Sequence, residues 1–325
     1  MKFPRRLALA ALAVCFAPLP ALATPTSGTL YFTTYAGGTN VNKTTYSYDG
    51  ASTFTLGGVT NIASTPGADG LIFAPDGDLI VGGQGNAVYK VDPGTGFFTS
   101  VNAAGTASFH VVLDPGGTQV YSAGIPGALA TIPLTPFANG TAHPLTGDDL
   151  AITTIAFDTT GKAYYTASGA GGFGNFGTID LTTYKTTRTM SGVAAAHGMS
   201  FDAFTGKLVL FGSSHVSQID LSSLTSLYSD YVSAGETFDQ GSVDGKGHIF
   251  AASNLGNLLF MDYSATGAVG SGSTFSAKTF LAANLDDIAP LSGAGSHVPE
   301  PETLFLLPLG LVGLFVARSK RKVAG

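Results

Sequence analysis

The sequence predicts an all-β protein built as a closed ring of six sheets, a six-bladed β-propeller. Apolar and β-branched runs of four to eight residues alternate with Gly, Asp and Pro turns, and no segment keeps a helical period. A motif of about 43 residues recurs along the chain. The two ends of the repeating region supply complementary parts of one further repeat, as closure of a ring requires.

Each repeat opens with an apolar triplet followed by an Asp-containing turn that ends in glycine. The segment 71–77 shows this order as Leu-Ile-Phe-Ala-Pro-Asp-Gly. Spacings of 40, 44, 45 and 41 residues separate the turn-closing glycines, which are Gly77, Gly117, Gly161, Gly206 and Gly247. Such a period, with four short strands in each repeat, is typical of propeller blades, whereas solenoid repeats are shorter.

The ends of the repeating region predict how the ring closes. Residues 285–291 read as the first strand of a blade, whereas 28–35, 44–49 and 53–59 read as the second, third and fourth strands. Joined together, they form one composite blade beside five complete ones. A seventh blade remains an alternative, because the irregular stretch 118–152 has room for extra strands.

The first 23 residues predict a signal peptide for Sec export. A basic start precedes the apolar segment 7–19, and the small residues Ala21 and Ala23 mark the predicted cleavage site. Cys15 is the one cysteine of the chain and lies inside this segment. The exported protein is therefore expected to lack disulfides, thiolate nucleophiles and cysteine metal ligands.

The predicted mature body is strongly acidic. Residues 24–297 carry 19 acidic and 8 basic side chains, a formal net charge of −11. This balance argues against a nucleic-acid partner, because binding the phosphate backbone needs a basic surface. It is compatible with divalent cations wherever carboxylates converge.

The C-terminus has three parts in a fixed order. A Pro-Glu-Pro turn comes first, then 14 apolar residues (304–317), then a basic cluster. The turn and the cluster comprise Val298, Pro299, Glu300 and Pro301, and Arg318, Lys320, Arg321 and Lys322. As a helix the apolar run would extend about 21 Å, less than the roughly 30 Å of a bilayer core. A simple membrane anchor with the body outside the cytoplasm remains an alternative.

These three parts resemble the PEP-CTERM sorting domain of Gram-negative bacteria. The resemblance implies transient anchoring in the inner membrane, recognition by an exosortase, removal of the tail, and delivery to the outer envelope or an exopolysaccharide matrix. The expected organisation is a signal peptide (1–23), a propeller (24–291), a linker (292–297) and a sorting signal (298–322).

The body resembles six-bladed propellers of the NHL-repeat and virginiamycin-lyase-like kind over residues 60–291. The Asp-x-x-Gly turns carry this resemblance, together with the Ile-Asp-Leu strands at 179–181 and 219–221. It implies an architecture and assigns no catalytic residue, because no active-site motif of those families is present.

A candidate site follows from aligning the repeats. The innermost strand of each blade lines the central channel, so the residues at its start are expected to surround one mouth. These pairs are Asp69-Gly70, Phe109-His110, Thr153-Thr154, His197-Gly198, Asp239-Gln240 and Asp286-Asp287. Five of the six carry a carboxyl or imidazole group, which predicts a polar ring.

Two roles are open for this ring. His110 and His197 are candidate catalytic residues, and a divalent cation such as calcium could be held by Asp69, Asp239, Asp286 and Asp287. The alternative is that these side chains cap turns or hydrate the channel. A separate hypothesis, glycan binding, relies on stacking against Tyr31, Tyr35, Tyr46, Tyr48, Tyr164 and Tyr165.

The favoured function is an exported binding or structural propeller of the cell envelope or matrix, not an enzyme. The alternative is a lyase or hydrolase that uses the histidines and aspartates of the channel mouth with a divalent cation. A redox or cofactor carrier fits least, because the body has neither Cys nor Trp.

Overall fold

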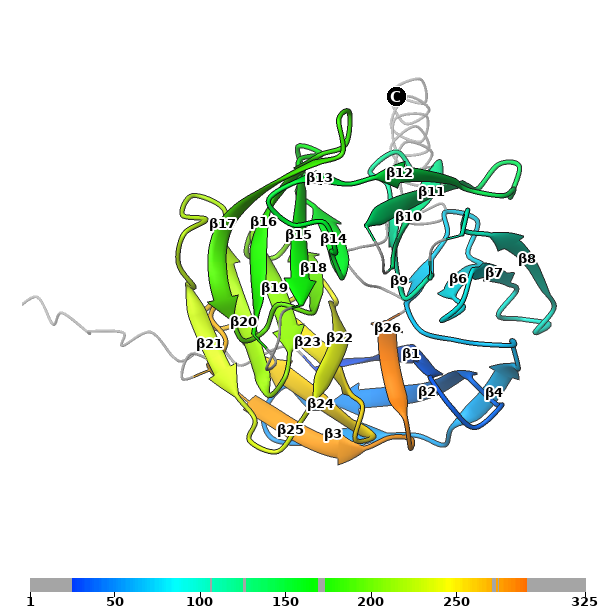
Figure 1. Ribbon diagram of the computed structural model, residues 1–325. Helices are drawn as coiled ribbons and strands as arrows, with labels where there is room; N and C mark the ends of the chain where they lie inside the picture. The colour runs from blue at the N-terminus through cyan, green and yellow to red at the C-terminus, as the bar shows by residue number, and fades with distance from the viewer. Residues whose placement is uncertain are drawn as a thin grey trace, which may run out of the picture.

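The computed structural model shows six sheets arranged around a central axis (Figure 1). It describes residues 25–105, 107–124, 127–168, 173–270, 273 and 275–290. The predicted all-β, six-bladed propeller is confirmed, and the described residues hold no seventh sheet. The predicted signal peptide, linker and sorting signal lie outside the described residues.

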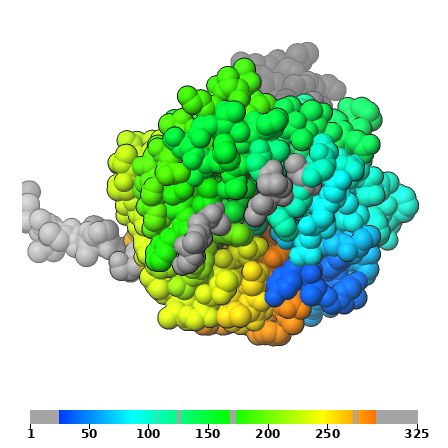
Figure 2. Space-filling view, in the orientation of Figure 1, coloured from blue at the N-terminus to red at the C-terminus, as the bar shows by residue number. Residues whose placement is uncertain are grey.

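The first blade is the predicted composite of the two chain ends. Strand β26 (Leu285–Pro290) pairs with β1 (Thr26–Thr34), so the orange end of the ribbon lies against the blue end (Figures 1 and 2). The blade continues outward through β2 (Val41–Tyr48), which pairs with β3 (Phe54–Leu56) and β4 (Thr60–Ala63). Pairing between the two ends of the propeller covers two strand edges that would otherwise be exposed.

The second, third and fourth blades follow in chain order. The second comprises β5 (Leu71–Phe73), β6 (Leu79–Gly82), β7 (Ala87–Val91) and β8 (Phe98–Asn102). The third comprises β9 (His110–Leu113), β10 (Gln119–Gly124), β11 (Ala128–Pro133) and β12 (Thr141–Pro144). The fourth comprises β14 (Thr154–Phe157), β15 (Ala163–Ser168), β16 (Gly174–Asp180) and β17 (Lys185–Val193).

The last two blades complete the ring. The fifth comprises β18 (Gly198–Asp202), β19 (Lys207–Gly212), β20 (His215–Asp220) and β21 (Ser229–Val232). The sixth comprises β22 (Phe238–Val243), β23 (His248–Ser253), β24 (Asn257–Asp262) and β25 (Phe275–Phe280).

The irregular stretch 118–152 does not form an extra blade. Most of it builds the third blade, and its end, β13 (Thr146–Gly147), pairs in parallel with β17 as a fifth strand of the fourth blade. Asp149 fixes this connection, because its carboxylate accepts hydrogen bonds from Tyr165 Oη (2.6 Å), Asn175 Nδ2 (2.7 Å) and Arg188 Nη2 (2.7 Å).

The Asp-x-x-Gly turns owe their recurrence to hydrogen bonding. In the third blade, Asp114 Oδ1 accepts from the backbone nitrogens of Thr118 (2.7 Å) and Gln119 (2.8 Å). Gly117 closes the turn at φ +67°, a backbone region that glycine adopts at little cost. The side chain of the aspartate thus replaces backbone partners that the tight turn leaves unsatisfied.

The core lies between the blades, where apolar side chains of neighbouring sheets pack face to face. Between the first and sixth blades, Phe54 stacks on Phe260 with ring centroids 4.3 Å apart, and Tyr48 and Phe250 join the same cluster. Because both faces of a blade are covered, middle strands such as β6, β19 and β24 are buried along nearly their whole length.

This packing overturns the glycan-stacking hypothesis for most of its tyrosines. Tyr31, Tyr46, Tyr48, Tyr164 and Tyr165 are all at most 8 % exposed. Tyr35, at 39 %, is the exception. The buried rings fill interblade space, so they are not available as a stacking surface.

The innermost strands are β26, β5, β9, β14, β18 and β22, and each contacts the next around the ring. They surround the central channel, with the residues at their starts together at one mouth. This arrangement places the candidate site.

Candidate functional site at the channel mouth

Five of the predicted residues converge at the channel mouth. The ligand atoms of His110, His197 and Asp239 lie within 4.8 Å of one another, as do those of Asp69, Asp239 and Asp286. Asp239 belongs to both groups and joins them. We call these five side chains the mouth cluster.

Two bulges turn carboxyl groups toward this point. The pairing of β22 with β23 shifts register between Phe238 and Gly241, and that of β26 with β1 shifts opposite Phe32 and Thr34. Asp239 and Asp286 lie at these two irregularities. A bulge re-aims side chains without ending a strand, which explains how two inner strands direct carboxyls into one cluster.

Glycines next to the cluster allow the blades to approach closely. A Cβ atom on Gly70 would lie 2.5 Å from the carbonyl oxygen of Phe109, and one on Gly198 would lie 2.6 Å from that of Asp239. Any larger residue would force the blades apart. The glycine that follows Asp69 or His197 therefore helps to set the spacing of the cluster.

The backbone of His197 is fixed from two sides. Its carbonyl oxygen accepts hydrogen bonds from the hydroxyls of Thr153 and Thr166, both at 2.8 Å, and its nitrogen donates to Phe211 O at 2.9 Å. Thr153 belongs to the fourth blade, which contributes no titratable side chain to the mouth cluster. Its role at the mouth is to position the imidazole of His197.

The imidazoles and Asp239 form a chain of short contacts. His110 Nε2 lies 3.3 Å from His197 Nε2, which lies 2.7 Å from Asp239 Oδ1. The rings of His110 and His197 meet edge to face, with centroids 5.1 Å apart. His110 and Asp239 are buried, whereas the side chain of His197 is 34 % exposed.

Burial and charge separate the titration of these three groups. Burial lowers the pKa of His110 to about 4, so its ring is neutral at pH 7. Burial would also lower the pKa of His197, but its hydrogen bond with Asp239 and that carboxylate's charge raise it overall. Burial would raise the pKa of Asp239, yet the contact with His197 lowers it to about 2.

The other carboxyls of the cluster are held toward their neutral form. Burial, followed by the charge of Asp239, raises the pKa of Asp69 to about 7. Burial and the charges of Asp69 and Asp239 raise the pKa of Asp286 well above its ordinary value. Three carboxyls this close cannot all ionise unless a cation joins them.

Two polar atoms of the cluster have no hydrogen-bond partner among the described residues. They are Asp286 Oδ2 and His110 Nδ1, on side chains that are each 3 % exposed. A buried polar atom without a partner costs free energy. For Asp286, which lies among the ligand atoms of the second group, a bound ion would remove that cost.

Asp287 does not join either group. Its Oδ2 accepts from the backbone nitrogen of Leu71 (2.5 Å) and its Oδ1 from that of Ile288 (2.6 Å), which links the first blade to the second. The sequence reading also missed Gln84, which hydrogen-bonds to the Asp69 carboxyl from a left-handed backbone conformation (φ 60°). A non-glycine residue in that region is a signal found only in structures.

The other histidines lie away from the channel mouth. His248 is buried, with Nδ1 2.6 Å from Asp244 Oδ2, and His143 stacks on Tyr184. His215 forms a half-exposed pair with Asp230, Nδ1 to Oδ2 2.9 Å. Through these contacts, all three histidines belong to the scaffold of the blades.

Comparison with known protein families matches the C-terminus. Residues 297–322 match the PEP-CTERM protein-sorting motif, which confirms the resemblance seen in the sequence. The motif implies an exported protein that is sorted by an exosortase. Comparison with curated proteins finds no match. The residues that the structure describes include no helix long and apolar enough to cross a membrane.

Comparison with solved structures confirms the propeller. Virginiamycin B lyase from Staphylococcus aureus superposes with a TM-score of 0.51 and 9 % identity over 79 % of this chain and 88 % of that one. A catalytically inactive form of the same enzyme with quinupristin gives 0.52 and 9 % over 83 % and 97 %. Regucalcin from Agrobacterium tumefaciens, a calcium-binding protein, gives 0.47 and 14 % over 61 % and 72 %. At these identities the likeness concerns the fold alone.

Proposed function

We propose that this chain is an exported propeller that binds one divalent transition-metal ion at its channel mouth and acts by binding in the cell envelope or exopolysaccharide matrix. The observation that carries the ion site is the short chain of contacts from His110 through His197 to Asp239. The sorting motif supports the destination.

The spacing of the ligand atoms suits one ion. Two ligands that each lie about 2.1 Å from a metal are about 3.0 Å apart at a right angle and about 3.4 Å apart at the tetrahedral angle. The separations of 3.3 Å between the imidazole nitrogens and 2.7 Å between His197 Nε2 and Asp239 Oδ1 are close to these values.

The kind of ligand selects the kind of ion. Imidazole nitrogens with a carboxylate suit zinc, manganese, iron or nickel, whereas calcium prefers oxygen ligands alone. The second group, Asp69, Asp239 and Asp286, offers only oxygen. The two groups share Asp239, and we assign the ion to the imidazole group. Calcium, named from the sequence as one example of a divalent cation, should therefore bind more weakly than these ions.

Calorimetry on the protein purified after export and freed of metal tests the assignment. We expect zinc or manganese to bind with a stoichiometry near one and calcium to bind more weakly. His110→Ala and His197→Ala should each weaken binding by about 100-fold or more, since a ligand is lost. His215→Ala is the matched control, because it also breaks a His–Asp pair. Equal loss in all three variants, or none, would contradict the proposal.

A metal-assisted lyase or hydrolase is the second candidate. The partly exposed His197 favours it, because this imidazole reaches both solvent and the buried carboxylate of Asp239. The His–Asp pair could then move a proton to or from a substrate at the mouth. A screen of the metal-loaded protein against lactones, esters and polysaccharides tests this reading. Turnover that His197→Gln leaves unchanged would exclude it.

A further inference from the structure

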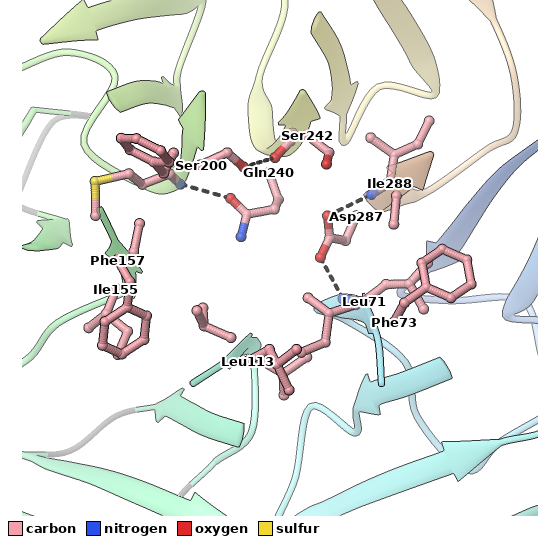
Figure 3. A pocket seen from close by; sticks show the side chains of 18 of the residues that line it. Leu71, Phe73, Leu113, Ile155, Phe157, Ser200, Gln240, Ser242, Asp287 and Ile288 are labelled. Atoms are coloured by element: carbon pink, nitrogen blue, oxygen red, sulfur yellow. Dashed lines mark hydrogen bonds between the residues drawn. The ribbon is translucent and has the colours of Figure 1, made fainter. Parts of the chain in front are cut away.

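We infer that the channel holds a second site at the end opposite the mouth cluster, which binds a small neutral molecule with an aromatic or branched apolar body and one carbonyl group. The inference goes beyond the ion site and does not depend on it. Its basis is a cavity of about 170 Å³ enclosed by the inner strands (Figure 3). We call this space the channel cavity.

The walls of the channel cavity are apolar. Residues of all six blades line it, and the apolar side chains left partly exposed within the ring are Ile72, Val112, Phe157 and Phe201. Pro115, Thr159 and Ala203 lie in or beside the turns that follow the inner strands, which places the opening at that end. The mouth cluster lies at the starts of the same strands.

The volume limits the size of the ligand. An apolar cavity of about 150 Å³ in another protein stays dry and binds benzene. The channel cavity is slightly larger, so it can hold one six-membered ring with a short substituent. A drug-sized ligand, which needs roughly 300 Å³ or more, would not fit inside.

One hydrogen-bond donor is directed into this space. Gln240 is 6 % exposed, and its Oε1 accepts from the backbone nitrogen of Met199 at 3.0 Å. The amide nitrogen, shown pointing into the cavity in Figure 3, makes no hydrogen bond to a described residue. Because the oxygen is fixed by Met199, the amide cannot turn its nitrogen away. A ligand carbonyl would accept the unused hydrogens.

The remaining polar groups argue against a charged ligand. Both oxygens of Asp287 already accept backbone hydrogens, from Leu71 and Ile288, so they offer little to a cation. A carboxylate ligand would be buried among apolar walls whose lining residues include no Lys, Arg or His to pair with it. Ser200 donates to Gly241 O at 2.8 Å. A neutral molecule with one acceptor therefore matches the lining.

Ligand-observed NMR and calorimetry with acetophenone test the inference in the presence of a chelator, which separates this site from the ion site. α-Methylstyrene has the same shape without the carbonyl oxygen, and benzoate carries a charge. We expect acetophenone to bind saturably, α-methylstyrene about tenfold more weakly because one hydrogen bond is lost, and benzoate not at all.

Two kinds of variant locate the site. Val112→Phe should fill the cavity and abolish binding of both neutral ligands. Val232→Phe, at a valine 54 % exposed on β21, should leave the affinity for both ligands unchanged. If Val112→Phe fails to fold, Ser242→Phe fills the same space from β22. Gln240→Leu removes the amide donor, so acetophenone should lose its tenfold advantage.

Three results would overturn the inference. If acetophenone shows no saturable binding, the cavity is not a site. If binding survives both cavity-filling variants, the ligand lies elsewhere. If α-methylstyrene binds as tightly as acetophenone, or Gln240→Leu changes nothing, the carbonyl assignment is wrong.

Discussion

Replacing Asp69 by Asn should stabilise the metal-free protein at alkaline pH, although it removes a residue of the mouth cluster. Burial and the charge of Asp239 raise the pKa of Asp69 to about 7, against about 3.9 in an unfolded chain. A carboxyl with a raised pKa favours folding fully below its unfolded pKa, and that contribution is lost as the pH rises through about 7. Asn stays neutral and avoids this loss.

The magnitude follows from the size of the shift. Three pKa units at about 1.36 kcal/mol each give an upper value of about 4 kcal/mol at pH 8. Because Asp69 shares its environment with Asp286, part of the cost remains in the variant, and we expect about 2 to 4 kcal/mol. For a domain of this size that corresponds to about 4 to 8 °C in Tm.

Thermal unfolding followed by circular dichroism, with chelator and at several pH values, provides the assay. The Tm of Asp69→Asn should match that of the wild type near pH 4 and exceed it at pH 8. Asp78→Asn, at a half-exposed carboxylate 3.4 Å from Lys90 Nζ, controls for the loss of one negative charge. A difference that does not vary with pH, or a less stable variant at pH 8, would refute the electrostatic reasoning.

Four further outcomes are expected. Zinc affinity should rise as the pH is increased from 5 to 8, because Asp239 raises the pKa of His197 and this imidazole must lose its proton before it binds the ion. Calorimetry that shows no pH dependence would contradict this. Gly198→Ala should weaken zinc binding although it replaces no ligand, since its Cβ would lie 2.6 Å from the backbone oxygen of Asp239 and displace that residue. Gly58→Ala, with open space around it, should not. Asp149→Asn should cost roughly 2 kcal/mol in urea unfolding, because it weakens a partly buried ion pair with Arg188. A cost equal to that of Asp78→Asn, which loses a half-exposed charge, would be evidence against the network. Mass spectrometry of the exported protein should find no residue after Glu300 in a host that has the sorting enzyme, and an intact Lys322 would show that the tail is not removed.

Much of the fold could be predicted because it repeats. An Asp-containing turn that ends in glycine marks five of the six blades, and the hydrogen bonds of Asp114 show why aspartate recurs there. Closure by β26 could also be predicted, since each chain end carries an incomplete blade. The addition of β13 to the fourth blade could not, because a two-residue parallel pairing leaves no pattern in the sequence.

The position of the mouth cluster could be predicted from the sequence, but not every residue that belongs to it. Aligning the repeats places Asp69, His110, His197 and Asp239 at one mouth, and the structure brings them together. Alignment could not separate Asp286 from its neighbour Asp287, because a bulge in β26 decides which of two adjacent side chains turns inward. The glycan-stacking hypothesis was wrong for five of its six tyrosines for a related reason. Composition does not show that both faces of a blade are covered.

The proposed site holds one metal ion between the two imidazoles and Asp239. An anomalous difference map from a crystal of the protein grown with zinc can locate that ion. We expect one peak about 2.0 to 2.2 Å from His110 Nε2, His197 Nε2 and an oxygen of Asp239. A channel mouth without a peak, or a peak bound only by Asp69 and Asp286, would contradict it.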